Sequence, residues 1–119
     1  FDSKLTGPQF VELHLMCEEH YAQLSLGVDE IAETIRTLGF AAPATYRAFA
    51  ELSSVKEIDG VPEATEMVTI LMQAHETVVR TSRAVLKIAQ QADDESSASV
   101  IGDRMRAHEK TGWLPRAPL

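Results

Sequence analysis

One histidine and three acids in the first third of the chain are spaced so that they could bind a metal ion. His14 and Glu18 lie four residues apart, and so do Asp29 and Glu33. Residues four apart share one face of an α-helix, so each pair could supply two ligands. An imidazole combined with carboxylate oxygens suits iron, and would also accept manganese or zinc. The residue types and their spacing therefore predict a metal site built from these two pairs.

The two pairs cannot reach one ion from a single straight helix. His14 and Asp29 would lie about 22 Å apart at a rise of roughly 1.5 Å per residue. The pairs are mirrored, however, because each lies at the same distance from a point between Gln23 and Leu24. If two copies of this helix pack antiparallel about a two-fold axis at that point, each pair meets the other pair of the partner. The alternative is an ordinary solvated helix face, on which acids are common.

The composition is typical of one globular domain. The chain has 119 residues, of which 45% are hydrophobic and 24% are charged. A chain of this length can bury a moderate core. Its 18 acids exceed its 11 lysines and arginines, which gives a formal net charge of −7. Such a surface repels a phosphate backbone, so DNA binding through this chain is not expected.

The sequence also limits where the protein works. No apolar run is long enough to span a bilayer, and no signal-peptide pattern opens the chain. We therefore expect a cytoplasmic protein without membrane contact. The single cysteine, Cys17, falls on an apolar helical stripe, which favours a buried thiol over a disulfide or a nucleophile.

Apolar residues recur at intervals of three and four along most of the chain, without strand-like alternation. This period predicts an all-α protein. Pro8 suits the first turn of a helix, and Gly39 suits the position after a last turn. The expected elements are long helices over residues 8–38, 64–92 and 97–113, with a short helix near 46–52 inside the connection 40–62.

Three long helices with one long connection are typical of a four-helix bundle whose first helix is missing. We therefore expect a single domain over residues 1–119 that lacks its N-terminal part. Such a bundle would expose an apolar groove unless an upstream segment or another chain fills it.

Short blocks spread over nearly the whole chain form a distinctive set. They are Thr6–Phe10, Leu13-His14, Glu18-Glu19, Asp29–Glu33 with Arg36 and Leu38-Gly39, Glu51–Ser54, His75–Thr77, and His108–Lys110 with Trp113. This set resembles the Dps family of ferritin-like mini-shells. The resemblance implies a ferritin-like four-helix bundle with a short helix in its long central connection.

The resemblance also implies an activity. Members of that family are hollow dodecamers that oxidise ferrous iron, preferably with hydrogen peroxide, and store the ferric mineral inside. By this resemblance the protein would be a ferroxidase that protects a bacterium against oxidative stress, cytoplasmic or nucleoid-associated. Its iron sites would lie at two-fold interfaces, with His14 and Glu18 from one subunit and Asp29 and Glu33 from its neighbour.

The chain departs from the family pattern ahead of Gly7. The family usually carries a further iron-binding histidine there, whereas the matching positions read Asp2-Ser3-Lys4. Asp2 could replace that histidine as an oxygen ligand, or it could be an inert surface acid. In the second case, the protein would be a shell with an impaired ferroxidase site that acts in metal sequestration or DNA protection.

Two further groups of residues have alternative interpretations. Residues 93–95 are acidic and precede the last helix, where the family has an acidic iron pore. Acids at a helix N-terminus are favoured in any case by the helix dipole. His20, His75 and His108 have no acidic partner that repeats the mirrored spacing, so we expect them to be structural.

Overall fold

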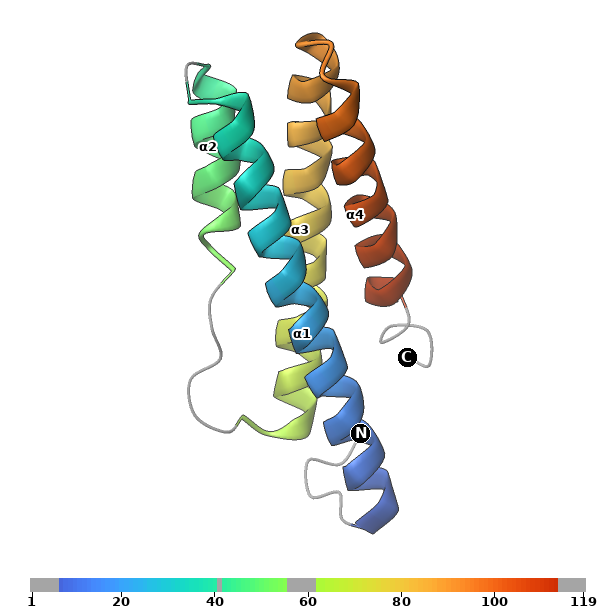
Figure 1. Ribbon diagram of the computed structural model, residues 1–119. Coiled ribbons are helices and arrows are strands. Elements are labelled where there is room, and N and C mark those ends of the chain that lie inside the picture. Colours follow the sequence, from blue (N-terminus) through green and yellow to red (C-terminus); the bar gives the residue numbers. More distant parts are fainter. Residues whose placement is uncertain (1–6, 41, 56–61, 114–119) are drawn as a thin grey trace.

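The chain is built from helices that agree with the predicted pattern (Figure 1). The computed structural model describes residues 7–40, 42–55 and 62–113, and these ranges contain helices and no strand, as an all-α protein requires. The helices are α1 (Gly7–Leu38), α2 (Pro43–Leu52), α3 (Ala64–Gln91) and α4 (Glu95–Trp113). The short helix α2 lies in the long connection between α1 and α3, where the sequence predicted one.

The helix ends follow local signals in the sequence. α1 stops at Leu38 because Gly39 adopts a left-handed conformation with φ of 84°. In that conformation the Gly39 N–H donates to the carbonyl oxygen of Ile35 at 3.0 Å, which closes the last turn. Each predicted boundary of the long helices lies within two residues of the observed one; the largest shift is at α4, which begins at Glu95.

The three long helices lie side by side around one core (Figure 1). α1 and α3 run in the same direction and α4 returns in the opposite one, while α2 packs beside α1 and α3. Burying a large aliphatic side chain contributes roughly 1.5–3 kcal/mol, so the core residues account for much of the stability. Among the described residues, the large aliphatic side chains that are fully buried are Ile31, Ile35, Val78, Val85 and Ile101.

The first turns of α1 project beyond the other helices (Figure 1). Phe10, Val11 and Leu15 are consequently at least half exposed, although all three are apolar. Further along the same helix Cys17 is buried, so the prediction of a buried thiol is confirmed, and burial raises the pKa of that thiol. Within the described ranges, no helix combines the length and apolarity needed to cross a membrane.

Candidate functional site

The first predicted pair lies together on the outer face of α1. The His14 Nε2 atom and the Glu18 Oε1 atom are 2.9 Å apart, which is hydrogen-bond distance, and the side chains are 59% and 63% exposed. The ring of Phe10 stacks on that of His14, with ring centroids 6.1 Å apart. Two potential ligands are thus held next to each other in a position that solvent, a metal ion or a second chain can reach.

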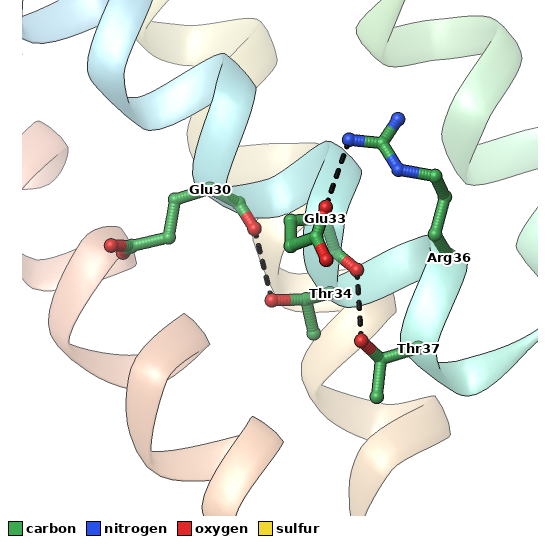
Figure 2. Close-up of polar contacts among 5 residues, drawn as sticks. All are labelled: Glu30, Glu33, Thr34, Arg36 and Thr37. Carbon is green, nitrogen blue, oxygen red and sulfur yellow. Dashed lines mark hydrogen bonds and ion pairs between the residues drawn. The ribbon is translucent and has the colours of Figure 1, made fainter.

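The second predicted pair is also exposed, fifteen residues further along the same helix. The Glu33 carboxylate has a partner on the same helix, because its Oε2 atom accepts a hydrogen bond from Arg36 Nη2 at 3.1 Å (Figure 2). The backbone oxygen of Glu33 accepts another from the Thr37 hydroxyl at 3.1 Å. Asp29 has no ion-pair partner within the described part of the chain, and it remains open to a ligand.

One chain alone does not bring the two pairs together. Within the described residues, no three histidine, cysteine, aspartate or glutamate side chains are grouped so that they could hold a metal ion. This agrees with the helix geometry, which separates the pairs along α1. The further candidate ligand, Asp2, lies outside the described residues. A four-ligand site therefore needs a second copy of α1.

The outer face of α1 carries an apolar surface between the two pairs. Tyr21 is 40% exposed and Leu26 is 64% exposed. Like the two pairs, they lie at equal distances from the midpoint between Gln23 and Leu24. Between them are the small exposed residues Ala22 and Ser25, which allow two helices to approach closely. If two copies pack about that point, each Tyr21 lies opposite the partner's Leu26. The apolar residues thus share the mirror relation of the candidate ligands.

The three histidines that we expected to be structural form a buried hydrogen-bonded chain. His20 comes from α1, His75 from α3 and His108 from α4, and all three are buried. His20 Nδ1 lies 3.0 Å from His75 Nε2, and His75 Nδ1 lies 2.9 Å from His108 Nδ1. The sequence placed His75 and His108 on inner helix faces, but it gave no indication that they touch. We refer to these three residues as the histidine chain.

Burial keeps the histidine chain neutral at pH 7. The pKa of His75 is lowered to about 3, mainly by burial and also by the neighbouring imidazoles of His108 and His20. Burial also lowers the pKa of His108 to about 4, with a smaller contribution from the positive charge of Arg104. The pKa of His20 is lowered by burial as well, against a weaker opposing effect of Glu19.

The histidine chain is not arranged for a single metal ion. His75 presents a different ring nitrogen to each neighbour, Nε2 to His20 and Nδ1 to His108. One ion can bind only one nitrogen of a given imidazole, so no ion can lie between all three rings in this arrangement. The histidine chain is therefore a polar connection between helices, and the candidate metal ligands remain those on the outer face of α1.

The acidic turn before α4 contains a helix cap. Asp94 Oδ1 accepts from the backbone N–H of Ser97 at 3.0 Å, and Asp94 Oδ2 accepts from the Ser97 hydroxyl at 2.7 Å. These two hydrogen bonds lower the pKa of Asp94, because they favour its charged form. The capping of α4 explains why it begins two residues earlier than predicted. It also supports the interpretation of this turn as a helix start.

Comparison with known proteins identifies the family to which this fold belongs. Residues 3–117 match the family model of the ferritin-like domain. A DNA protection during starvation protein 2 of Bacillus anthracis is 34% identical over 113 residues, which cover 95% of this chain and 77% of that protein. The chain belongs to the ferritin-like family and, within it, to the group of DNA protection during starvation (Dps) proteins.

Two other relatives show how far this similarity extends. A DNA protection during starvation protein of Brevibacillus brevis is 32% identical over 119 residues, which are 100% of this chain and 80% of that protein. An uncharacterized low temperature-induced protein of Nostoc sp. strain PCC 7120 is 38% identical over 115 residues. The chain spans 64% of the length of the Nostoc protein.

Proposed function

We propose that this protein assembles into a hollow shell of identical subunits that oxidises Fe(II) and stores the ferric product. The observation that carries the proposal is the exposure of two mirrored ligand pairs on the outer face of α1. Membership of the ferritin-like family supports iron as the metal, and the mirrored apolar residues Tyr21 and Leu26 support pairing of two subunits through this face. A dodecamer in the bacterial cytoplasm is the proposed assembly.

In this proposal each iron site is shared by two subunits. His14 and Glu18 of one subunit and Asp29 and Glu33 of its partner bind Fe(II) as the substrate. Carboxylates are suited to this task because they stabilise the charge of iron as it rises from 2+ to 3+. Two Fe(II) ions supply one electron each, and one hydrogen peroxide molecule takes up both electrons and two protons to give two molecules of water. Removing Fe(II) and peroxide together would protect the cell against oxidative stress.

The proposal is tested by native mass and by the rate of iron oxidation. We expect a large homo-oligomer that oxidises Fe(II) with hydrogen peroxide faster than buffer does. The double substitution His14→Ala with Asp29→Ala removes one ligand from each pair, and should slow oxidation by more than about 100-fold, since even outer partners of metal ligands cost 10–100-fold. Glu12→Ala with Glu19→Ala is the matched control, because it removes two exposed acids of α1 outside the mirrored positions.

Each result has a clear consequence. A monomer at working concentration would remove the shared site altogether. An unchanged oxidation rate in the ligand variant, or an equal loss in the control variant, would show that the mirrored pairs do not bind the iron. Asp2→Ala then asks whether Asp2 acts as a further ligand, since only a ligand should affect the rate.

The alternative proposal is a shell with an impaired iron site that acts in metal sequestration or DNA protection. It is favoured by the name of the Bacillus anthracis relative, a DNA protection during starvation protein. The formal charge of −7 opposes direct DNA binding by this chain. An intact shell that binds iron weakly and oxidises it no faster than buffer would support this alternative. Retardation of DNA at low and moderate salt would show whether binding occurs in spite of the charge.

A further inference from the structure

The histidine chain joins three helices through contacts that depend on protonation. It links α1 to α3 and α3 to α4 through buried imidazoles, 55 and 33 residues apart in sequence. These links lie in the core, where a polar group that loses its hydrogen-bond partner destabilises the fold. The iron site proposed above uses none of these three residues.

The number of protons on the three imidazoles decides which hydrogen bonds the histidine chain can form. Each of its two hydrogen bonds needs one proton between two facing nitrogens. Three neutral rings carry three protons, so two lie in the hydrogen bonds and one lies on an outer Nε2 atom. One added proton can occupy the second outer Nε2 atom, and both hydrogen bonds are kept. If His75 and His108 are both charged, however, two Nδ1–H groups face each other across 2.9 Å and their hydrogen bond is lost.

We propose that the histidine chain is an acid-sensitive lock of the bundle. It holds α1, α3 and α4 together while His75 and His108 are neutral, and it opens the contact between α3 and α4 when both are protonated. The lock is a property of the single chain, so it does not depend on the proposed iron site or on the proposed shell.

The surroundings of the two rings favour the neutral state. From α1, the facing groups are His20, with Glu19 beside it, and Gly27, whose Cα lies against the ring of His108. From α4, Arg104 adds a positive charge near His108, and its guanidinium lies 3.9 Å from Glu30 of α1. Among the described residues, no charged group of α2 contributes to the pKa of any of the three histidines.

The direction of the pH effect follows from these pKa values. An unfolded histidine has a pKa near 6.5, whereas the pKa of folded His75 is about 3 and that of folded His108 about 4. The contribution of each neutral ring to the free energy of unfolding is therefore complete above pH 6.5. It is lost as the pH falls toward 4 for His108 and toward 3 for His75. At pH 5 the unfolded state should bind about one more proton at each site than the folded state.

The test compares His75→Gln with Val78→Ala in the full chain. Both residues are fully buried on α3, but only the histidine titrates. The free energy of unfolding is measured by urea denaturation between pH 7.5 and 5. The measured quantity is the factor by which the unfolding equilibrium constant increases between pH 6 and pH 5. This factor should be about tenfold larger in wild type and in Val78→Ala than in His75→Gln, which has one titrating site fewer.

The same pH dependence in both variants, after correction for their stability at pH 7.5, would overturn the proposal. A second measurement decides the question if His75→Gln does not fold. The ¹⁵N chemical shifts of the imidazoles in the wild-type protein should show His75 and His108 as neutral rings throughout the folded state, with protonation coinciding with the loss of helix signal. Protonation of both rings while all helices and the His75–His108 contact persist would equally refute the lock.

Discussion

The outer and inner faces of α1 each carry a histidine, one exposed to solvent and one buried in the core. On the outer face, His14 is exposed and pairs with Glu18 of the same helix. On the inner face, His20 is buried and contacts His75 of another helix. Exposed pairs contribute little to stability, whereas buried polar groups must be satisfied within the fold. The inner residues are therefore fixed by one chain, and the outer residues are available to a ligand or to a second chain.

Gly27→Ala should have the largest effect on stability, because it disturbs the inner face directly. An added Cβ would collide with the Nε2 atom of the buried His108 ring, whose other nitrogen, Nδ1, is hydrogen bonded to His75. Overpacking of this kind costs roughly 1–3 kcal/mol, against a gain of at most about 1 kcal/mol in helix propensity. We therefore expect a net loss of about 1–2 kcal/mol in the free energy of unfolding, measured by urea denaturation at pH 7.5.

The matched control is Gly102→Ala in α4. The nearest atoms to its added Cβ belong to the flexible guanidinium of Arg106, at 3.4 Å and beyond. This substitution should stabilise the protein by about 0.5–1 kcal/mol, since alanine is the better helix residue. If Gly27→Ala were as stabilising as Gly102→Ala, the contact between α1 and the histidine chain would be looser than the structure shows.

The sequence predicted the local features of this molecule better than the distant contacts. The period of three and four, Pro8 and Gly39 predicted the helices, because these signals act within a few residues. The shared face of His14 and Glu18 also follows from spacing within one helix, and the structure places the two side chains there, 2.9 Å apart. The proposed pairing with a second chain is a prediction that one chain cannot test.

The histidine chain could not be predicted in the same way. His20, His75 and His108 meet only because α1, α3 and α4 pack with one particular rotation and register. Sequence periodicity gives the inner face of each helix, but not which residues on two inner faces lie at the same height. Gly27 is the one further signal, since a residue without a side chain on an inner face leaves room for a large neighbour such as His108.

Arg36→Gln should have a moderate effect, confined to the outer face. Arg36 and Glu33 are 54% and 71% exposed, so their ion pair contributes little to stability. The positive charge nevertheless competes with a metal ion for the Glu33 carboxylate. We expect Arg36→Gln to raise the affinity for Co(II) by about 2- to 5-fold at low salt, in line with an ion-pair energy below about 1 kcal/mol. The affinity is measured by visible absorption during a Co(II) titration.

Arg106→Gln provides the control for this prediction. Arg106 pairs with Asp103 at the same three-residue spacing, but on α4 and away from the candidate ligands. It should leave the affinity for Co(II) unchanged. A fall in affinity in Arg36→Gln would mean that Arg36 holds Glu33 in position for the metal. Glu33 would then be fixed by a residue of its own chain, as the buried histidines of the inner face are.

Asp94→Asn should have the smallest effect, and it tests an acid that already has its partners within the chain. The pKa of Asp94 is lowered by the backbone N–H and the hydroxyl of Ser97, so its charged form stabilises α4. This contribution is complete above the unfolded pKa near 3.8 and is lost as the pH falls through the lower folded value. Asparagine still caps a helix, so the melting temperature should fall slightly at pH 7 and should approach that of wild type at a second, acid pH below 3.8.

Asp93→Asn separates this capping from a general effect of acids in the turn. Asp93 has a φ of 56°, a conformation that asparagine tolerates well, and Ser97 donates to Asp94 instead. The melting temperature of Asp93→Asn should therefore equal that of wild type at both pH values. If both variants changed equally, or if the difference in Asp94→Asn persisted at low pH, the acids of this turn would resemble Asp29 on the outer face, which has no ion-pair partner among the described residues.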